Sequence, residues 1–178
     1  MMKIKSLGGF AALALVALAS CQSTDRTVRL GLTQSEARDP EGNADYADLT
    51  RTRGGEIQVS SGNVVALVHV SGTDSEAFGE NADLYRVSFG MGAEYGYDIG
   101  AVRVIGQAGV MATALEADLR SFERTQSEVG AFIGLGVEAE VADGINLFLI
   151  GRPLEPSVNF GGSDLDARTI LFGVGFDF

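Results

Sequence analysis

The chain has little of several residue types, and each shortage excludes a class of structure. Its 178 residues include one cysteine, Cys21, so an intrachain disulfide is impossible and a cysteine-based metal site is excluded. The only two lysines, Lys3 and Lys5, lie close to the N-terminus, and there is no tryptophan. Beyond the first 20 residues no run of about 18 apolar residues occurs, so we expect no transmembrane helix.

Positive charge is also scarce. Lysine and arginine total 13, so without the two lysines 11 arginines remain against 24 aspartates and glutamates, a net charge of −13. A surface of this sign repels the phosphates of nucleic acids, so we expect no nucleic-acid partner. The length is enough for one domain.

The N-terminus has the pattern of a targeting segment. A positive start precedes the apolar stretch 10–19, which is too short to span a membrane as a helix. The segment Leu18-Ala19-Ser20-Cys21 resembles the lipobox of bacterial lipoproteins. The resemblance implies that Cys21 is acylated, with palmitate among its acyl chains, and that Gln22 after it favours sorting to the outer membrane. The alternative is ordinary cleavage after Ala19, which leaves Cys21 unmodified.

Strict alternation of apolar and small or polar residues dominates the rest of the chain. The clearest segment is 84–97, in which odd-numbered positions from Tyr85 to Tyr97 are apolar or aromatic. Side chains alternate between the faces of a strand, so this pattern predicts strands and excludes a helical stripe. Phe132 and Phe148 break the pattern. Either they plug the interior or a bulge shifts the register locally, and we expect the plug. The predicted strands are 27–35, 46–59, 63–72, 84–97, 101–115, 127–141, 145–154 and 168–178.

The predicted connections alternate between short and long. Tight turns are expected around Gly62, Gly100 and Gly144, because glycine supplies the positive φ that such turns need. An even number of strands places both chain ends on the short-turn rim. The long connections are expected at about 36–45, 73–83, 116–126 and 155–167.

The last predicted strand carries the most specific pattern. Ile170, Phe172, Val174, Phe176 and Phe178 share one face, and Leu171, Gly173, Gly175 and Asp177 occupy the other. A strand between lipid and a polar lumen needs such a division. The segment resembles the closing strand of bacterial outer-membrane barrels, and the chain as a whole resembles the small OmpA/OmpX-type barrels. Residues expected to form aromatic girdles at the membrane interfaces are Tyr85, Tyr95, Tyr97, Phe176 and Phe178.

This resemblance implies an all-β fold, an eight-stranded antiparallel up-and-down transmembrane β-barrel. It also implies a location in the outer membrane of a Gram-negative bacterium, with the lipid anchor on the periplasmic side and no cofactor or metal. The implied partners are outer-membrane lipid and lipopolysaccharide, and the barrel-assembly machinery through the C-terminal strand. The predicted divisions are a lipoprotein-type signal peptide over 1–20, a lipidated tether over 21–26 and the barrel over 27–178.

Charged residues within the strands fall on the face opposite the apolar one. The interior of an eight-stranded barrel holds little besides side chains, and buried charges must be paired. We therefore predict an arginine–carboxylate network that fills the lumen. Its expected members are Arg29, Arg86, Arg103 and Arg152 with Glu56, Glu94, Glu138, Glu140 and Asp177.

Two groups of residues could support chemistry. His69 and Ser71 point inward and faintly resemble the His-x-Ser of the lipid A 3-O-deacylases, with Glu76, Glu80 or Asp83 as the acid that orients the histidine. The alternative is a lumen histidine bonded to a carboxylate beside a rim serine. The acidic residues of 73–83 do not fit the EF-hand pattern, which favours a solvated loop.

Three functions follow from these patterns. The leading hypothesis is a non-catalytic integral barrel that supports envelope integrity or surface interaction through short acidic loops, which carry −11 of the charge. The second is a soluble periplasmic-facing lipoprotein with a β-barrel or sandwich core. The third is a lipid A-modifying hydrolase. Glycine and the absence of lysine on the polar face favour the first, because glycine is costly in a solvated strand.

Overall fold

A computed structural model describes residues 26–38, 51–75, 82–119, 122–160 and 163–178. The described residues contain strands and turns, and no helix among them is long and apolar enough to cross a membrane. The strands are β1 (Arg26–Arg38), β2 (Arg51–Ser61), β3 (Val64–Ser75), β4 (Ala82–Ile99), β5 (Val102–Leu119), β6 (Phe122–Ala142), β7 (Ile145–Leu154), β8 (Val158–Phe160) and β9 (Ser163–Asp177).

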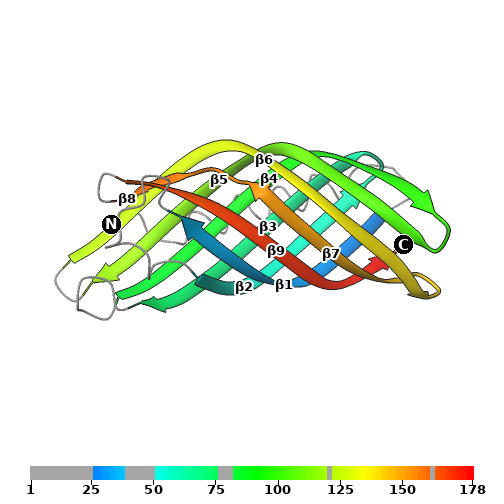
Figure 1. The fold of residues 1–178 in the computed structure, drawn as a ribbon, viewed down its shortest axis with the longest axis horizontal. Helices are drawn as coiled ribbons and strands as arrows, with labels where there is room; N and C mark the ends of the chain where they lie inside the picture. The colour runs from blue at the N-terminus through cyan, green and yellow to red at the C-terminus, as the bar shows by residue number, and fades with distance from the viewer. Residues whose placement is uncertain (1–25, 39–50, 76–81, 120–121, 161–162) are drawn as a thin grey trace.

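Eight of these strands close into a barrel. Each strand from β1 to β6 pairs antiparallel with the next, and β7 pairs antiparallel with β9. The first and last strands then pair with each other, from Thr27↔Asp177 to Arg38↔Asp166, which closes the ring. Figure 1 shows the strands strongly tilted around a long barrel. The predicted eight-stranded antiparallel up-and-down barrel is therefore confirmed.

The hairpin turns confirm the predicted short rim. Gly62, Gly100 and Gly144 have φ values of 58°, 65° and 67°, the left-handed region that glycine adopts without strain. These turns lie at the end of the barrel where the C-terminus is labelled in Figure 1. Arg26 and Phe178 exchange backbone hydrogen bonds at the same end.

At the opposite rim the strands extend further than the sequence indicated. The expected connection 116–126 is wrong for most of its length, because β5 and β6 pair as far as Leu119↔Phe122. The expected connection 155–167 contains β8, which pairs only with β9 as a short hairpin. Backbone pairing continues where side-chain alternation ends, so pattern alone underestimates strand length. Residues 46–50 of the predicted second strand lie outside the described residues.

The two faces of the wall differ as predicted. Leu135 on β6 is 62% exposed and Met91 on β4 is 57% exposed, and both point away from the axis. Arg29 and Phe132, at inward positions, are 1% and 0% exposed. The packed core therefore lies inside the ring, and the apolar row forms its outer surface.

Candidate functional site

The lumen contains two clusters of buried ion pairs. The first surrounds Arg29 of β1. The guanidinium of Arg29 donates to both oxygens of Glu94 at 2.8 and 3.1 Å and to both oxygens of Glu138 at 3.0 Å. Arg29 also donates to Ser60 Oγ at 3.0 Å. The planar guanidinium fork thus holds two carboxylates from β4 and β6, and all three charged side chains are buried.

The second cluster lies nearer the long-loop rim and centres on Arg152 of β7. Arg152 holds the carboxylate of Glu56 through both terminal nitrogens, one contact being 2.6 Å. It also approaches Glu155 at 3.4 Å. The other oxygen of Glu155 accepts from Arg86 at 2.9 Å and from Thr169 at 2.8 Å. Each carboxylate of this cluster therefore has at least one arginine partner.

Two glutamines join the clusters. Gln107 donates to Glu94 at 2.8 Å and to Gln58 at 3.0 Å. Gln58 in turn donates to Glu56 at 2.8 Å. A continuous path of hydrogen bonds therefore runs from Glu138 to Arg86. A network of this kind fixes the stagger of the strands, because each polar group depends on the position of its neighbours.

Apolar side chains block the space beside this path. Leu67, Met111 and Phe132 form one buried cluster. Phe148, Ile150 and Leu171 form a second. Inward glycines make room for them: a Cβ at Gly31 would lie 3.0 Å from Phe148 Cζ. The expectation that Phe132 and Phe148 plug the lumen is confirmed.

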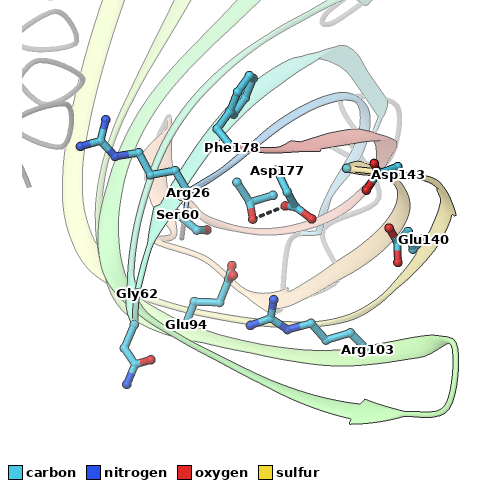
Figure 2. Close-up of a pocket in the computed structure, with 12 residues that line it drawn as sticks. Arg26, Ser60, Gly62, Glu94, Arg103, Glu140, Asp143, Asp177 and Phe178 are labelled. Carbon is cyan, nitrogen blue, oxygen red and sulfur yellow. Dashed lines mark hydrogen bonds between the residues drawn. The ribbon is translucent and has the colours of Figure 1, made fainter. Parts of the chain in front are cut away.

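The short-turn mouth of the barrel is open and polar. A cavity of about 580 Å³ is lined there by Glu94, Glu140 and Asp177 among others. Figure 2 shows Arg103 and Glu140, from the neighbouring strands β5 and β6, at this mouth. Asp177 accepts from Thr27 at 2.6 Å and from Asn146 at 2.7 Å.

The expected network is thus divided by the structure. Arg29, Glu94 and Glu138 come together. Arg152 meets the predicted Glu56, whereas the partner that Arg86 and Arg152 share, Glu155, was not predicted. Within the described residues, Arg103 and Glu140 have no ion pair within 4.0 Å. Asp177 is exposed at the mouth and is bonded to neutral groups. Glu140 and Asp177 are exposed at the open mouth, whereas Arg103 is half-buried and its Nε is buried without a hydrogen-bond partner among the described residues.

His69 and Ser71 lie together in the lumen. His69 Nε2 is 3.0 Å from Ser71 Oγ, and His69 Nδ1 is 3.4 Å from a carboxylate oxygen of Glu56. The order of groups is that of a hydrolytic triad. Both side chains are at most 3% exposed, and Arg152 already holds Glu56. The side chains of Glu76, Glu80 and Asp83, the expected acids, lie outside the described residues.

The aromatic residues expected at the interfaces lie on the outer wall. Tyr85, Tyr95, Tyr97 and Phe178 are 52–77% exposed, and Phe176 is half-buried. Tyr95 and Tyr97 precede the turn at Gly100, and Tyr85 lies toward the other rim. Cys21 lies outside the described residues. Among the side chains that are described, no group of three or more histidines and acids could hold a metal ion.

Several members of the lumen network escaped sequence reasoning. Glu155 lies in a predicted connection, and Gln58 and Gln107 carry no charge that would mark them as partners. The inward position of Ile105 and Met111 follows from alternation, because both share the face of Gln107. Alternation therefore places Ile105, Met111 and Gln58 in the lumen, but it cannot find Glu155.

Comparisons with known proteins agree with this geometry. Residues 8–178 match the family described as outer membrane protein beta-barrel domain. Ail, the attachment invasion locus protein of Yersinia pestis, is similar in structure with a TM-score of 0.61 and 13% identity, covering 88% of this chain and 100% of Ail.

Two other solved structures share the fold. Neisserial surface protein A has a TM-score of 0.61 and 16% identity, covering 86% of this chain and 97% of that one. A major outer membrane protein from Thermus thermophilus has a TM-score of 0.52 and 12% identity, covering 86% of this chain and 99% of that one. A comparison with curated protein sequences gives no match. None of these comparisons shows a catalytic function.

Proposed function

The chain belongs to the outer membrane protein β-barrel domain family, and from this premise we propose that it is a non-catalytic integral barrel of the Gram-negative outer membrane. Its role is to support envelope integrity or surface interaction through short acidic loops. An N-terminal lipid on Cys21 adds a second attachment on the periplasmic side.

One observation carries the proposal: the apolar side chains are outside and the charges are inside. Leu32 is 60% exposed and Val129 is 70% exposed, and similar residues recur on every strand of the ring. Exposed apolar surface costs about 25 cal/mol per Å² in water, and a continuous belt of it is favourable only against hydrocarbon. A soluble barrel or sandwich would reverse the two faces, so the wall argues against the soluble lipoprotein.

The acidic loops suggest what the outer surface binds. The predicted long connections carry most of the negative charge of the chain. Ail of Yersinia pestis has been crystallised with the heparin analogue sucrose octasulfate, which is a polyanion. The acidic connections here would repel such a ligand unless divalent cations bridged the two. We therefore assign them to lipopolysaccharide bridged by divalent cations, or to a cationic partner.

The position of the chain ends supports the anchor and the assembly route. Arg26 begins β1 on the rim that also holds Phe178, only five residues after Cys21. A lipid on Cys21 could therefore enter the leaflet nearest to this rim. The C-terminal strand β9, with its row of outward apolar residues, is the segment proposed to engage the barrel-assembly machinery.

Fractionation and gel mobility test the proposal. We expect the protein to remain with outer membranes after carbonate extraction and to migrate differently before and after boiling, because a closed barrel resists dodecyl sulfate until it is heated. Release by carbonate together with unchanged mobility would contradict the integral barrel. A Cys21→Ser variant that still inserts but no longer incorporates labelled palmitate would support the anchor separately.

A further inference from the structure

We propose that a groove on the outer wall, between β1, β6, β7 and β9, binds the phosphorylated head and one acyl chain of lipid A. The inference rests on the proposed function, since it takes the outer wall to face lipid. The groove has a volume of about 410 Å³. Its lining includes Gln34, Leu135, Gly151, Pro153, Arg168 and Ile170.

A local irregularity of the sheet creates this groove. Between β6 and β7 the register shifts, because Ile133 pairs with Leu154 whereas Leu135 pairs with Gly151. Pro153 lies within the shift and has no N–H to donate. Gly151 points outward without a side chain, so the wall is hollowed beside Leu135. The hollow is therefore a property of the fold and is not formed by one rotamer.

The depth of the groove matches an interface between hydrocarbon and headgroups. Arg168 precedes Phe178 on the inner rim by ten residues, or about 33 Å of strand at ~3.3 Å per residue. At a tilt of ~40° this rises about 25 Å, the height of the apolar band of such barrels. Arg168 thus lies at the outer edge of the band, and Ile170 lies one step deeper.

Arg168 supplies the charge that the ligand must complement. It is exposed on the outer wall, and no described carboxylate lies within 4.0 Å of it. The backbone register places Glu36 opposite Arg168, and the side chain of Glu36 lies outside the described residues. Below Arg168 the groove is apolar, since Leu135 and Ile170 are more than half exposed. A cation above an apolar hollow fits a phosphate above an acyl chain, and guanidinium binds phosphate bidentately.

The rim on which the groove lies indicates which lipid supplies the phosphate. The groove is at the end opposite the three tight turns, which the proposed function places at the cell surface. The phosphorylated lipid of that leaflet is lipopolysaccharide, whereas glycerophospholipids fill the inner leaflet. We therefore commit to the lipid A phosphate.

Native mass spectrometry of the full-length protein in detergent tests the assignment. The probes are diphosphorylated lipid A, the same lipid A after phosphatase treatment, and phosphatidylglycerol. We expect one diphosphorylated lipid A to remain bound, with at least tenfold weaker retention of the other two lipids. Equal retention of phosphatidylglycerol, or of the dephosphorylated lipid A, would overturn the assignment.

Matched variants separate the groove from the general charge of the wall. Arg168→Gln should lower retention about tenfold, whereas Arg53→Gln, which removes an exposed arginine outside the lining, should not. Gly151→Leu should fill the groove and abolish retention. Gly106→Leu is its control, because a Cβ at either glycine meets no atom closer than 3.9 Å. Equal losses in the two arginine variants, or in the two leucine variants, would contradict the proposal.

The proposed function can fail independently of the groove. A wild-type protein that inserts in the outer membrane, but binds lipid A no better than Arg168→Gln, disproves the groove alone. Release of the wild type by carbonate disproves both.

Discussion

At the scale of single residues, two buried arginines of the lumen, Arg29 and Arg152, each bind two carboxylates. Arg29 makes five hydrogen bonds to three side chains while almost fully buried. Ion pairs in such a place are costly to break, because the remaining charge keeps its desolvation penalty without its partner. The stability of the barrel should therefore depend on these residues far more than on its exposed arginines.

We predict that Arg29→Gln lowers the free energy of unfolding by about 3–5 kcal/mol, since it leaves Glu94 and Glu138 buried without their cation. Urea unfolding in detergent, followed by circular dichroism, measures the change. The control Arg53→Gln, on the outer wall, should change it by about 0.5 kcal/mol or less. Adding Glu94→Gln and Glu138→Gln to Arg29→Gln should restore part of the loss, and no restoration would argue against unpaired charge as its cause.

A second prediction at the residue scale concerns the contact of His69 with Ser71. Because both side chains are enclosed and Arg152 holds the nearby Glu56, substrate cannot reach the hydroxyl. We expect lipid A from cells that produce the protein to keep all its acyl chains. Mass spectrometry of lipid A from cells with wild type and with Ser71→Ala should give identical spectra. Loss of a 3-O-linked chain that depends on Ser71 would establish the hydrolase instead.

At the scale of the strands, alternation predicted which face of each strand is apolar, and glycine predicted the three turns. It could not predict which carboxylate meets which arginine, because period two fixes the face of a residue but not the stagger between strands. Alternation therefore places both Arg152 and Glu56 on the inward face but does not pair them. Alternation also could not find Glu155, which lies beyond the alternating part of β7.

The strand pair that closes the barrel gives an element-scale prediction. A Cβ at Gly173 of β9 would collide with the backbone of Leu30 and Gly31 of β1. Gly173→Ala should therefore weaken closure by about 1–3 kcal/mol, as overpacking does. The unboiled gel band should convert to the unfolded position at a lower temperature. Gly106→Ala, where a Cβ finds open space, is the control, and an equal shift in both variants would contradict the account.

At the scale of the whole molecule, the polarity of the two faces of the sheet is the reverse of that in a soluble protein. Charges and glutamines fill the centre together with two apolar plugs, and the outer surface is aliphatic and aromatic. Bilayer hydrocarbon stabilises such a surface, and a closed ring leaves no unpaired strand edge in lipid. All the functional proposals depend on this placement of the two faces.

Nitroxide scanning along β4 measures that placement most directly. Single cysteines at the outward positions 87, 89, 91, 93, 95 and 97, in a Cys21→Ser background, leave the lumen network intact. In reconstituted bilayers the account predicts high collision rates with oxygen and low rates with a water-soluble nickel chelate at Phe89 and Met91, shifting toward nickel at Tyr97. High nickel accessibility along the whole row, or immobile labels that neither reagent reaches, would contradict it.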